Sequence, residues 1–258
     1  MRIVSFDVFR SLHITGVHYI KPEKYLEHLD LVRAADWVLF PEYWQVNSLY
    51  YGLNCRIFPS IASYHLGHDK VEMTRIFQTV CPRNIPQTQV EAGTPEGIRA
   101  LLEQFVFPFV AKDVRSSEGR GVYKIDNELD WHRYCRGRQV LYAQEYLPID
   151  RDLRLVVIGD RVVASYWRLQ SPDGFHNNIA AGGSLDFAPA PAAAVELVER
   201  LSRQLEINHA GFDVAMVGEQ PYILEFNRLF GNHGLSEQDI RPAELIYQYL
   251  LQQHASKS

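Results

Sequence analysis

The sequence predicts an α/β protein that begins with a small parallel sheet and continues into two α+β lobes. Through residues 1–62, short apolar runs alternate with amphipathic stretches, a pattern typical of parallel strands connected by helices. From about residue 63 the pattern changes, and pairs of strand-like segments follow one another with helices between them. We therefore expect one small α/β domain followed by a larger, two-lobed region.

Composition narrows the class of protein. The chain has 258 residues, of which 47% are hydrophobic and 22% charged, as in a globular protein with a packed core. No segment approaches the roughly 18 uninterrupted apolar residues of a membrane-spanning helix. With 26 basic against 31 acidic residues, the net charge of −5 predicts no nucleic-acid partner. Asp7 lies where a signal peptide would need an apolar residue, and the three cysteines lie far apart, as expected of reduced thiols. We therefore expect a cytoplasmic protein without a membrane partner.

In the first third, apolar runs predict strands at residues 2–8, 37–40 and 55–59, and amphipathic stretches predict helices at 21–34 and 42–53. The loop after the first strand lacks the Gly-x-Gly-x-x-Gly turn, so no dinucleotide site is predicted there. Four aromatic residues recur at roughly helical spacing and predict core and interface packing, with a homodimer contact as an alternative: Tyr43, Trp44, Tyr50 and Tyr51.

Beyond residue 63, four segments with helical patterning alternate with strands. The helices are expected at 68–81, 95–105, 192–205 and 237–253. The strands are expected at 86–90, 109–112, 122–125, 140–145, 153–158, 162–167, 212–217 and 222–226. The turn Gly159–Asp160 joins two of these strands into a hairpin.

Three oxygen-bearing side chains near the end of the chain predict a metal site. If Val217 pairs with Pro221 across a hairpin, Asp213 lies directly opposite Glu225, and Asn227 falls on the same face. Two carboxylates so close repel each other unless a cation lies between them, and hard oxygen ligands suit Mg²⁺. The alternative is a solvated sheet face with ordinary hairpin carboxylates.

A loop of small residues lies between the strands expected at 109–112 and 122–125. Its glycines free the backbone to aim N–H groups at a phosphate, and its serines add hydroxyl donors, which makes candidate phosphate ligands of Ser116, Ser117, Gly119 and Gly121. The loop lacks the spacing of a P-loop, and the alternative is an ordinary hairpin loop.

Two lysines are candidates for phosphate contacts. Lys112 lies late in a strand just before this loop, and Lys70 lies near the start of a helix. A strand lysine in that position can reach phosphates that lie beneath the loop. The alternatives are a snorkelling edge residue for Lys112 and a solvated helix residue for Lys70.

A strand that runs into a turn can present backbone groups to an adenine edge. The segment Gln144, Glu145, Tyr146 and Leu147 has this form, and the carboxylate of Asp152 follows close enough to hold ribose hydroxyls. The alternative for the charges at 151–154 is a ladder of surface ion pairs, and taken singly that alternative is favoured.

Together these segments resemble the ATP-grasp carboxylate–amine ligases, and most of all the branch of ribosomal-protein glutamate ligases, lysine-biosynthesis ligases and glutathione synthetase. The resemblance runs from about residue 63 to the C-terminus and rests on residues 69–73, 108–112, 117–122, 144–147, 151–160, 178, 182–183, 210–213 and 224–227. It implies an ATP-grasp fold with a short Rossmann-like domain before it. The implied units are a pre-ATP-grasp α/β domain (1–62), a small lobe with the glycine-rich loop (63–146) and a C-terminal lobe with the magnesium site (147–258).

The resemblance also implies a role for each candidate residue. Lys70 and Lys112 would contact the phosphates of ATP, the backbone of 145–147 would contact adenine, and Asp152 would lie near the sugar. Arg168 and Asn178 would hold phosphates and the acyl-phosphate, Arg154 would lie in the catalytic cleft, and Mg²⁺ would be bound by Asp213, Glu225 and Asn227. Two Mg²⁺ ions are expected, with Mn²⁺ as an alternative.

The implied chemistry is phosphoryl transfer from ATP to a substrate carboxylate, followed by attack of an amine to give an amide and ADP. The substrates would be small molecules or peptides that carry these groups. Two alternatives stay open: an ATP-grasp kinase that acts on a hydroxyl, and a nucleotide-binding module without turnover. The chain departs from its relatives at Ala181, where an arginine is common, and in the short first domain, which leaves the substrate open.

Overall fold

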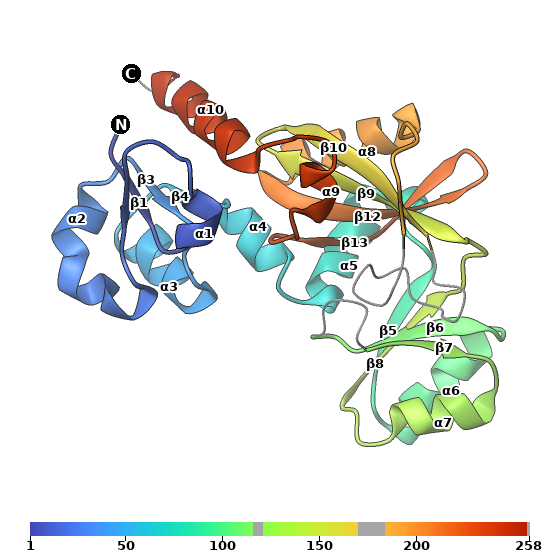
Figure 1. Cartoon of the computed structure of the whole chain (residues 1–258). Helices are drawn as coiled ribbons and strands as arrows, with labels where there is room; N and C mark the ends of the chain where they lie inside the picture. The colour runs from blue at the N-terminus through green and yellow to red at the C-terminus, as the bar shows by residue number, and fades with distance from the viewer. Residues whose placement is uncertain (116–120, 170–183, 257–258) are drawn as a thin grey trace.

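The structure, a computed structural model, describes residues 1–115, 121–169 and 184–256, which fold around three β-sheets (Figure 1). No helix in these ranges is long and apolar enough to cross a membrane. The three cysteines, Cys55, Cys81 and Cys135, are buried and unpaired, which confirms the prediction of free thiols.

The first sheet is parallel, as predicted, with the strand order β2-β1-β3-β4. Its strands are β1 (Ile3–Ser5), β2 (Val17–Tyr19), β3 (Trp37–Leu39) and β4 (Ile57–Phe58). The edge strand β2 was not predicted, because its residues are half-buried or exposed and form no apolar run. The helices around this sheet are α1 (Val8–Ser11), α2 (Leu29–Arg33), α3 (Tyr43–Asn47) and α4 (Ile61–Leu66).

Both helices predicted in this region were wrong in their extent. Residues 22–28 form a 3₁₀ helix, and the φ of −121° at His28 separates it from the short α2. After α3 the chain continues as a turn of π-helix at Ser48–Gly52. The aromatic residues of this stretch were predicted to pack in a core, but they are 38–61% exposed: Tyr43, Trp44, Tyr50 and Tyr51. A homodimer contact there stays a prediction.

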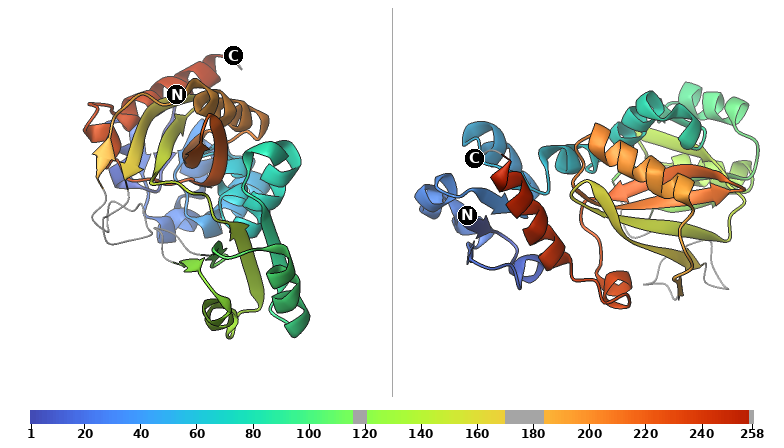
Figure 2. Two further views of the ribbon diagram at one scale, coloured as in Figure 1. Left: turned by 90° about the vertical axis from the view of Figure 1, so that its right-hand side faces the viewer. Right: turned by 90° about the horizontal axis from the view of Figure 1, so that it is seen from above.

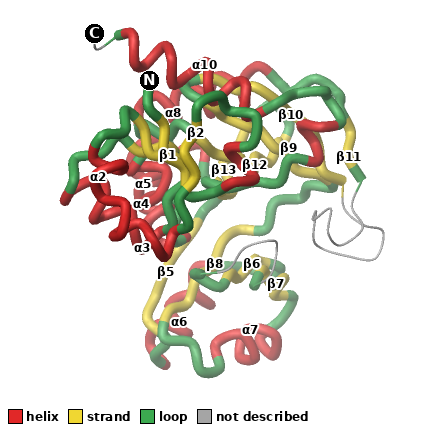
Figure 3. The backbone as a smooth tube through the Cα atoms, turned by 60° about the vertical axis from the view of Figure 1, so that its left-hand side comes forward, coloured by secondary structure: helices red, strands yellow, loops and turns green. Residues whose placement is uncertain are grey.

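The second sheet is antiparallel, with the order β5-β8-β6-β7. With α6 and α7 it forms a unit that lies apart from the other two sheets (Figure 3). Its elements are β5 (Thr88–Ala92), α6 (Pro95–Gln104), β6 (Phe109–Lys112), β7 (Val122–Ile125), α7 (Glu128–Cys135) and β8 (Val140–Glu145). Helix α7 was not predicted, although the side chain of Asn127 caps it by accepting from the backbone of Asp130.

The third sheet has the order β11-β10-β9-β12-β13 and is antiparallel throughout. Its strands are β9 (Arg151–Ile158), β10 (Arg161–Leu169), β11 (Leu185–Asp186), β12 (His209–Val217) and β13 (Gln220–Asn227). Side chains alternate along β9: Leu153, Leu155 and Val157 belong to the main hydrophobic core, which leaves Asp152 and Arg154 on the opposite face. That face carries the candidate site.

Two helices contribute to the core beneath this sheet. Helix α8 (Ala192–Gln204) supplies Leu197 and Val198, and helix α5 (Lys70–Val80) supplies Met73 and Phe77. Helix α5 therefore packs with the third sheet, although it precedes the second sheet in sequence. The connection to β5 includes the 3₁₀ turn Pro82–Asn84.

The helix predicted at 237–253 begins later than predicted, as α10 (Pro242–Ala255), and a short helix that was not predicted, α9 (His233–Ser236), precedes it. Pro242 begins α10, a position where its missing N–H and fixed φ are tolerated. Helix α10 packs beside the first sheet, where Ile246 and Leu250 share a hydrophobic cluster with Ile3 and Trp37 (Figure 2). The C-terminal helix thus covers a sheet made of N-terminal strands.

Candidate active site

The hairpin of β12 and β13 places the predicted carboxylates side by side. Asp213 lies directly opposite Glu225, as predicted, but the predicted pairing of Val217 with Pro221 was wrong. Val217 pairs with Gln220 and Met216 with Pro221, and a bulge between Asp213 and Val214 shifts the register by one residue. The turn is one residue shorter than predicted, and the bulge offsets this difference. The two carboxylates therefore still lie opposite each other.

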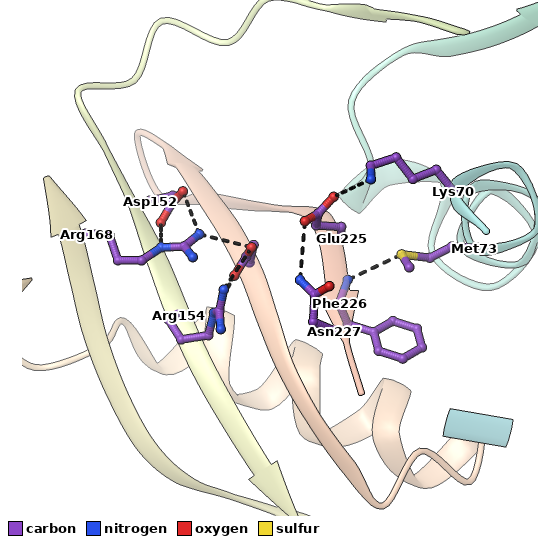
Figure 4. A network of polar contacts seen from close by, with 9 residues as sticks. Lys70, Met73, Asp152, Arg154, Arg168, Glu225, Phe226 and Asn227 are labelled. Atoms are coloured by element: carbon purple, nitrogen blue, oxygen red, sulfur yellow. Dashed lines mark hydrogen bonds and ion pairs between the residues drawn. The ribbon is translucent and has the colours of Figure 1, made fainter. Parts of the chain in front are cut away.

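Asp213 lies between two arginines, Arg154 and Arg168, both of which are labelled in Figure 4. Nε of Arg154 and Nη2 of Arg168 lie 2.5 Å and 3.0 Å from its carboxylate oxygens. Strand register explains the contact with Arg154, because that residue is directly opposite Asp213 on β9. Burial raises the pKa of Asp213, but the two guanidinium groups outweigh it and hold the pKa below its usual value.

Arg168 also contacts Asp152, which is directly opposite it on β9. Its Nε and Nη2 donate to the two carboxylate oxygens at 2.6 Å and 2.9 Å, a bidentate pair. Two aspartates and two arginines thus form a cluster with no net charge, and each side chain is only 8–13% exposed: Asp152, Arg154, Arg168 and Asp213. The surface ion-pair ladder, the alternative for residues 151–154, is therefore excluded for Asp152 and Arg154; Arg151 alone forms a half-exposed pair, with Asp186.

Glu225 connects this hairpin to helix α5. Its Oε2 lies 3.5 Å from Nζ of Lys70, and its Oε1 accepts from Nδ2 of Asn227 at 3.3 Å (Figure 4). Asp69 caps α5 by accepting from the backbone of Val71, which fixes the first turn and hence Lys70. Lys70 is 9% exposed, so the alternative of a solvated helix residue was wrong.

Lys112 is buried at the end of β6, which excludes the alternative of a snorkelling edge residue. Its Nζ lies 5.9 Å from the centre of the Tyr142 ring, and the hydroxyl of Tyr134 on α7 donates to its carbonyl at 2.6 Å. Burial lowers the pKa of Lys112 to about 8, with Glu225 opposing the shift and Lys70 adding to it.

This shifted pKa predicts how nucleotide affinity depends on pH. A lysine with a depressed pKa is charged below that value, so Lys112 loses its charge as the pH rises through about 8. We expect the affinity for ADP to fall above pH 8, by up to about tenfold per pH unit. Calorimetric titrations between pH 6.5 and 9.5 measure this dependence. The Lys112→Met variant should bind ADP weakly with no break near pH 8; an unchanged break would assign it to another group.

The other candidates lie near the end of β8 or outside the described residues. The side chain of Gln144 donates to the hydroxyl of Thr88 at 2.8 Å, and the backbone N–H of Glu145 donates to Gln87 at 2.8 Å. Gly121 closes the glycine-rich loop, with a φ of +73° and a carbonyl that accepts from the backbone of Asp113. Four candidates lie outside the described residues: Ser116, Ser117, Gly119 and Asn178.

Comparison with known proteins identifies the family. Residues 69–248 match the family model of the RimK-like ATP-grasp domain, which is more than half of the chain. The chain belongs to the RimK-like ATP-grasp family. The match covers the third sheet, helix α5 and the second sheet, and with them every candidate residue.

Relatives in this family carry ligase names. The chain is 33% identical over 135 residues to a probable alpha-L-glutamate ligase of Stenotrophomonas maltophilia (strain R551-3), covering 50% of this chain and 46% of that protein. It is 25% identical over 239 residues to the ribosomal protein bS6–L-glutamate ligase of Escherichia fergusonii, covering 86% and 76%. The chain spans about half the length of the probable alpha-L-glutamate ligases of Stenotrophomonas maltophilia and Pseudomonas paraeruginosa that it matches.

Solved structures confirm the ATP-grasp fold. A RimK domain ATP-grasp protein from Sphaerobacter thermophilus superimposes with a TM-score of 0.71 at 16% identity, covering 96% of this chain and 99% of that one. The D-alanine–D-alanine ligase of Bacillus anthracis complexed with ATP gives a TM-score of 0.72 at 14% identity, covering 100% of both chains. At these identities the likeness shows the fold alone.

The RimK-like chain carries further residues at the site that the sequence did not single out. The hydroxyl of Tyr142 on β8 lies 2.8 Å from that of Thr74 on α5, which joins the second sheet to the helix beneath the third. The hydroxyl of Tyr134 fixes the strand of Lys112, as described above. The sequence signal that could have pointed to Tyr142 was the apolar and aromatic pattern of residues 140–145. That pattern predicts a strand, but it does not predict the hydrogen-bond partner of the Tyr142 hydroxyl.

Proposed function

We propose that this chain is an ATP-dependent carboxylate–amine ligase that forms an amide or peptide bond through an acyl-phosphate and releases ADP and phosphate. The observation that carries the proposal is the convergence of Asp213 and Glu225 from one hairpin with two buried lysines, Lys70 and Lys112, from two other elements. Membership of the RimK-like ATP-grasp family and the names of the relatives support it.

The donor set fits a divalent ion. Asp213, Glu225 and Asn227 offer carboxylate and amide oxygens, the ligand type that Mg²⁺ takes, and Glu225 and Asn227 already lie in contact. When bound, Mg²⁺ would neutralise charge on the phosphate oxygens of ATP. We propose these three residues as its ligands, with two ions and with Mn²⁺ as an alternative.

The cations of the site would act on the transferring phosphoryl group. A substrate carboxylate oxygen attacks the γ-phosphorus as the bond to the bridging oxygen of ADP breaks, and negative charge spreads over the equatorial oxygens. Lys70 and Lys112 would stabilise that charge, and both are held in place by contacts already present in the fold. Arg154 and Arg168 would face the same cleft from β9 and β10.

The second step joins the amine. Its nitrogen attacks the acyl carbon, the carbon–oxygen bond to phosphate breaks, and the nitrogen loses a proton as the amide forms. Asn178 would help to hold the acyl-phosphate, and Ser116, Ser117, Gly119 and Gly121 would contact phosphates. Adenine would bind against the backbone of 145–147, and Asp152 would lie near the sugar, where it would act by holding Arg168.

The units of the chain take separate parts in this proposal. Residues 63–146 and 147–258 would enclose the nucleotide, and residues 1–62 would help to bind a substrate. The relatives named for glutamate ligation suggest an amino acid such as L-glutamate as one substrate and a small molecule or peptide as the other.

A screen of amino-acid pairs with ATP and Mg²⁺ tests the proposal. We expect release of ADP and phosphate in equal amounts, and mass spectrometry should find an amide of the two partners. Release of AMP and pyrophosphate would refute the proposal. A stable phosphate ester would indicate a kinase, and ADP binding without any turnover would indicate a nucleotide-binding module.

A further inference from the structure

Arg228 follows a candidate metal ligand in the sequence, and its guanidinium has no polar partner among the described residues. It follows Asn227 directly at the end of β13 and is half-buried. Its guanidinium lies 4.4 Å from the centre of the Tyr64 ring, and its carbonyl accepts from Nδ1 of His209 at 2.6 Å. Within residues 1–115, 121–169 and 184–256, the guanidinium makes no ion pair and no hydrogen bond, whereas Arg154 and Arg168 are both paired with aspartates.

The position of Arg228 is set by the first sheet. The hydroxyl of Tyr64, on α4, donates at 2.6 Å to the carbonyl of Pro41, the second residue after β3. The order β2-β1-β3-β4 places the topological switch of the sheet between β1 and β3, and ligands of open parallel sheets bind outside the carboxyl ends of the strands at this point. Phe40, the residue after β3, has a φ of +49°, a strained conformation of the kind found at ligand sites.

The other charged groups near Tyr64 are already used within the fold. Asp7 caps α1 and lies 3.4 Å from Nε of Arg10, and Arg10 also donates to the carbonyl of Phe230 at 3.2 Å. Glu42 caps α3 with its side chain. These two acids and Arg10 therefore satisfy one another or the backbone, and in the described part of the chain no acceptor faces the donors of Arg228.

We propose that Arg228 binds a carboxylate group of a substrate at the carboxyl edge of the first sheet. A guanidinium presents two parallel N–H donors that match the two oxygens of a carboxylate, and stacking on the buried Tyr64 ring holds this fork in one plane. Arg228 directly follows Asn227 at the end of β13, so the backbone that carries a candidate metal ligand also carries the proposed carboxylate-binding residue. That the bound molecule is a substrate rests on the proposed ligase function; the binding of a carboxylate does not.

Paired ligands and paired variants test this inference by a thermodynamic cycle. The probes are L-glutamate, L-alanine and L-alanyl-L-alanine, each compared with its α-carboxamide, and binding is measured by calorimetry in the presence of ADP and Mg²⁺. We expect the chain to bind at least one carboxylate about tenfold or more tightly than its amide, since the amide cannot form the charge-assisted pair with the guanidinium. Arg228→Met should lose this preference, with a 10- to 100-fold weaker affinity for the carboxylate and an unchanged affinity for the amide.

Two further variants separate recognition from folding. Arg228→Lys keeps a cation near Tyr64 but loses the two-donor fork, so its affinity should be intermediate and its Tm close to that of the parent chain. Arg203→Met removes a half-exposed arginine from the end of α8 and should change neither binding nor Tm.

Each outcome bears on the inference. Carboxylate affinity that survives in Arg228→Met, or a parent chain that prefers none of the carboxylates over its amide, overturns it. An equal loss of ADP affinity would assign Arg228 to the nucleotide phosphates and also overturn it. If carboxylate binding depends on Arg228 but no amide is ever formed, the inference stands and the proposed ligase function fails; if ligation proceeds with an unchanged KM in Arg228→Met, the reverse holds.

Discussion

Glu225→Gln is expected to abolish ligase turnover, with a loss of about 1,000-fold or more, while the chain remains folded. The substitution removes one ligand charge from the candidate magnesium site and keeps the size of the side chain. Glu225 is 20% exposed and its ion pair with Lys70 is 3.5 Å long, so its neutralisation removes less stabilisation than the loss of a fully buried, shorter ion pair. The rate of ADP release and the affinity for Mg²⁺·ADP, measured by calorimetry, should fall together.

Glu219→Gln is the matched control, because Glu219 lies exposed in the turn of the same hairpin. It removes the same charge at the other end of β13 and should leave activity and metal affinity unchanged. A Tm that drops by as much as the activity does in Glu225→Gln would instead identify Glu225 as a structural residue.

Asp213→Asn is expected to destabilise the fold itself, by about 3–5 kcal/mol, because it leaves the buried guanidinium of Arg154 without a compensating charge and Arg168 with Asp152 alone. Only 8% of the Asp213 side chain is exposed, and both Arg154 and Arg168 contact it. Urea unfolding should show a lower midpoint with an unchanged m-value. Thus two neighbouring carboxylates that both serve the candidate metal site should respond differently: one mainly in activity, the other in stability as well.

The control for Asp213 is Glu244→Gln on α10, which breaks an ion pair with Arg241 whose side chains are 60–70% exposed. We expect a change below about 1 kcal/mol. If Asp213→Asn were equally mild, water or a rearranged Asp152 would have to satisfy the arginines, and the cluster would contribute little to the fold.

Sequence patterns predicted the elements that depend on local spacing. Apolar runs and turn residues predicted the parallel first sheet without β2, the strands of the second sheet, the strands of the third sheet without β11, and the turn at Gly159–Asp160, and the structure confirms these elements. The predicted extents of the helices at 21–34 and 42–53 were wrong. The non-helical φ at His28 and the turn of π-helix at Ser48–Gly52 interrupt the α-helical hydrogen bonds, and hydrophobic periodicity reveals neither interruption.

The sequence predicted which residues belong to the candidate site better than it predicted how they are arranged. That Asp213 lies opposite Glu225 was predicted, but the bulge that brings it about was not, since an extra residue in one strand has no local signal here. The burial of Asp152 and Arg154 depends on partners 16 and 59 residues away, Arg168 and Asp213. A charged residue in a sequence is expected to be exposed unless a partner of opposite charge is known. The burial of Asp152 and Arg154 therefore becomes evident only in the folded chain.

The packing of α10 against the first sheet has a consequence for how the chain folds as it is synthesised. Ile3 and Trp37 emerge from the ribosome early, but Ile246 and Leu250, which cover them, emerge only after both lobes have been made. Until then one side of the nascent sheet lacks its cover and is open to chaperones or to wrong partners. The N-terminal strands therefore depend for their final packing on the segment translated last among the described helices.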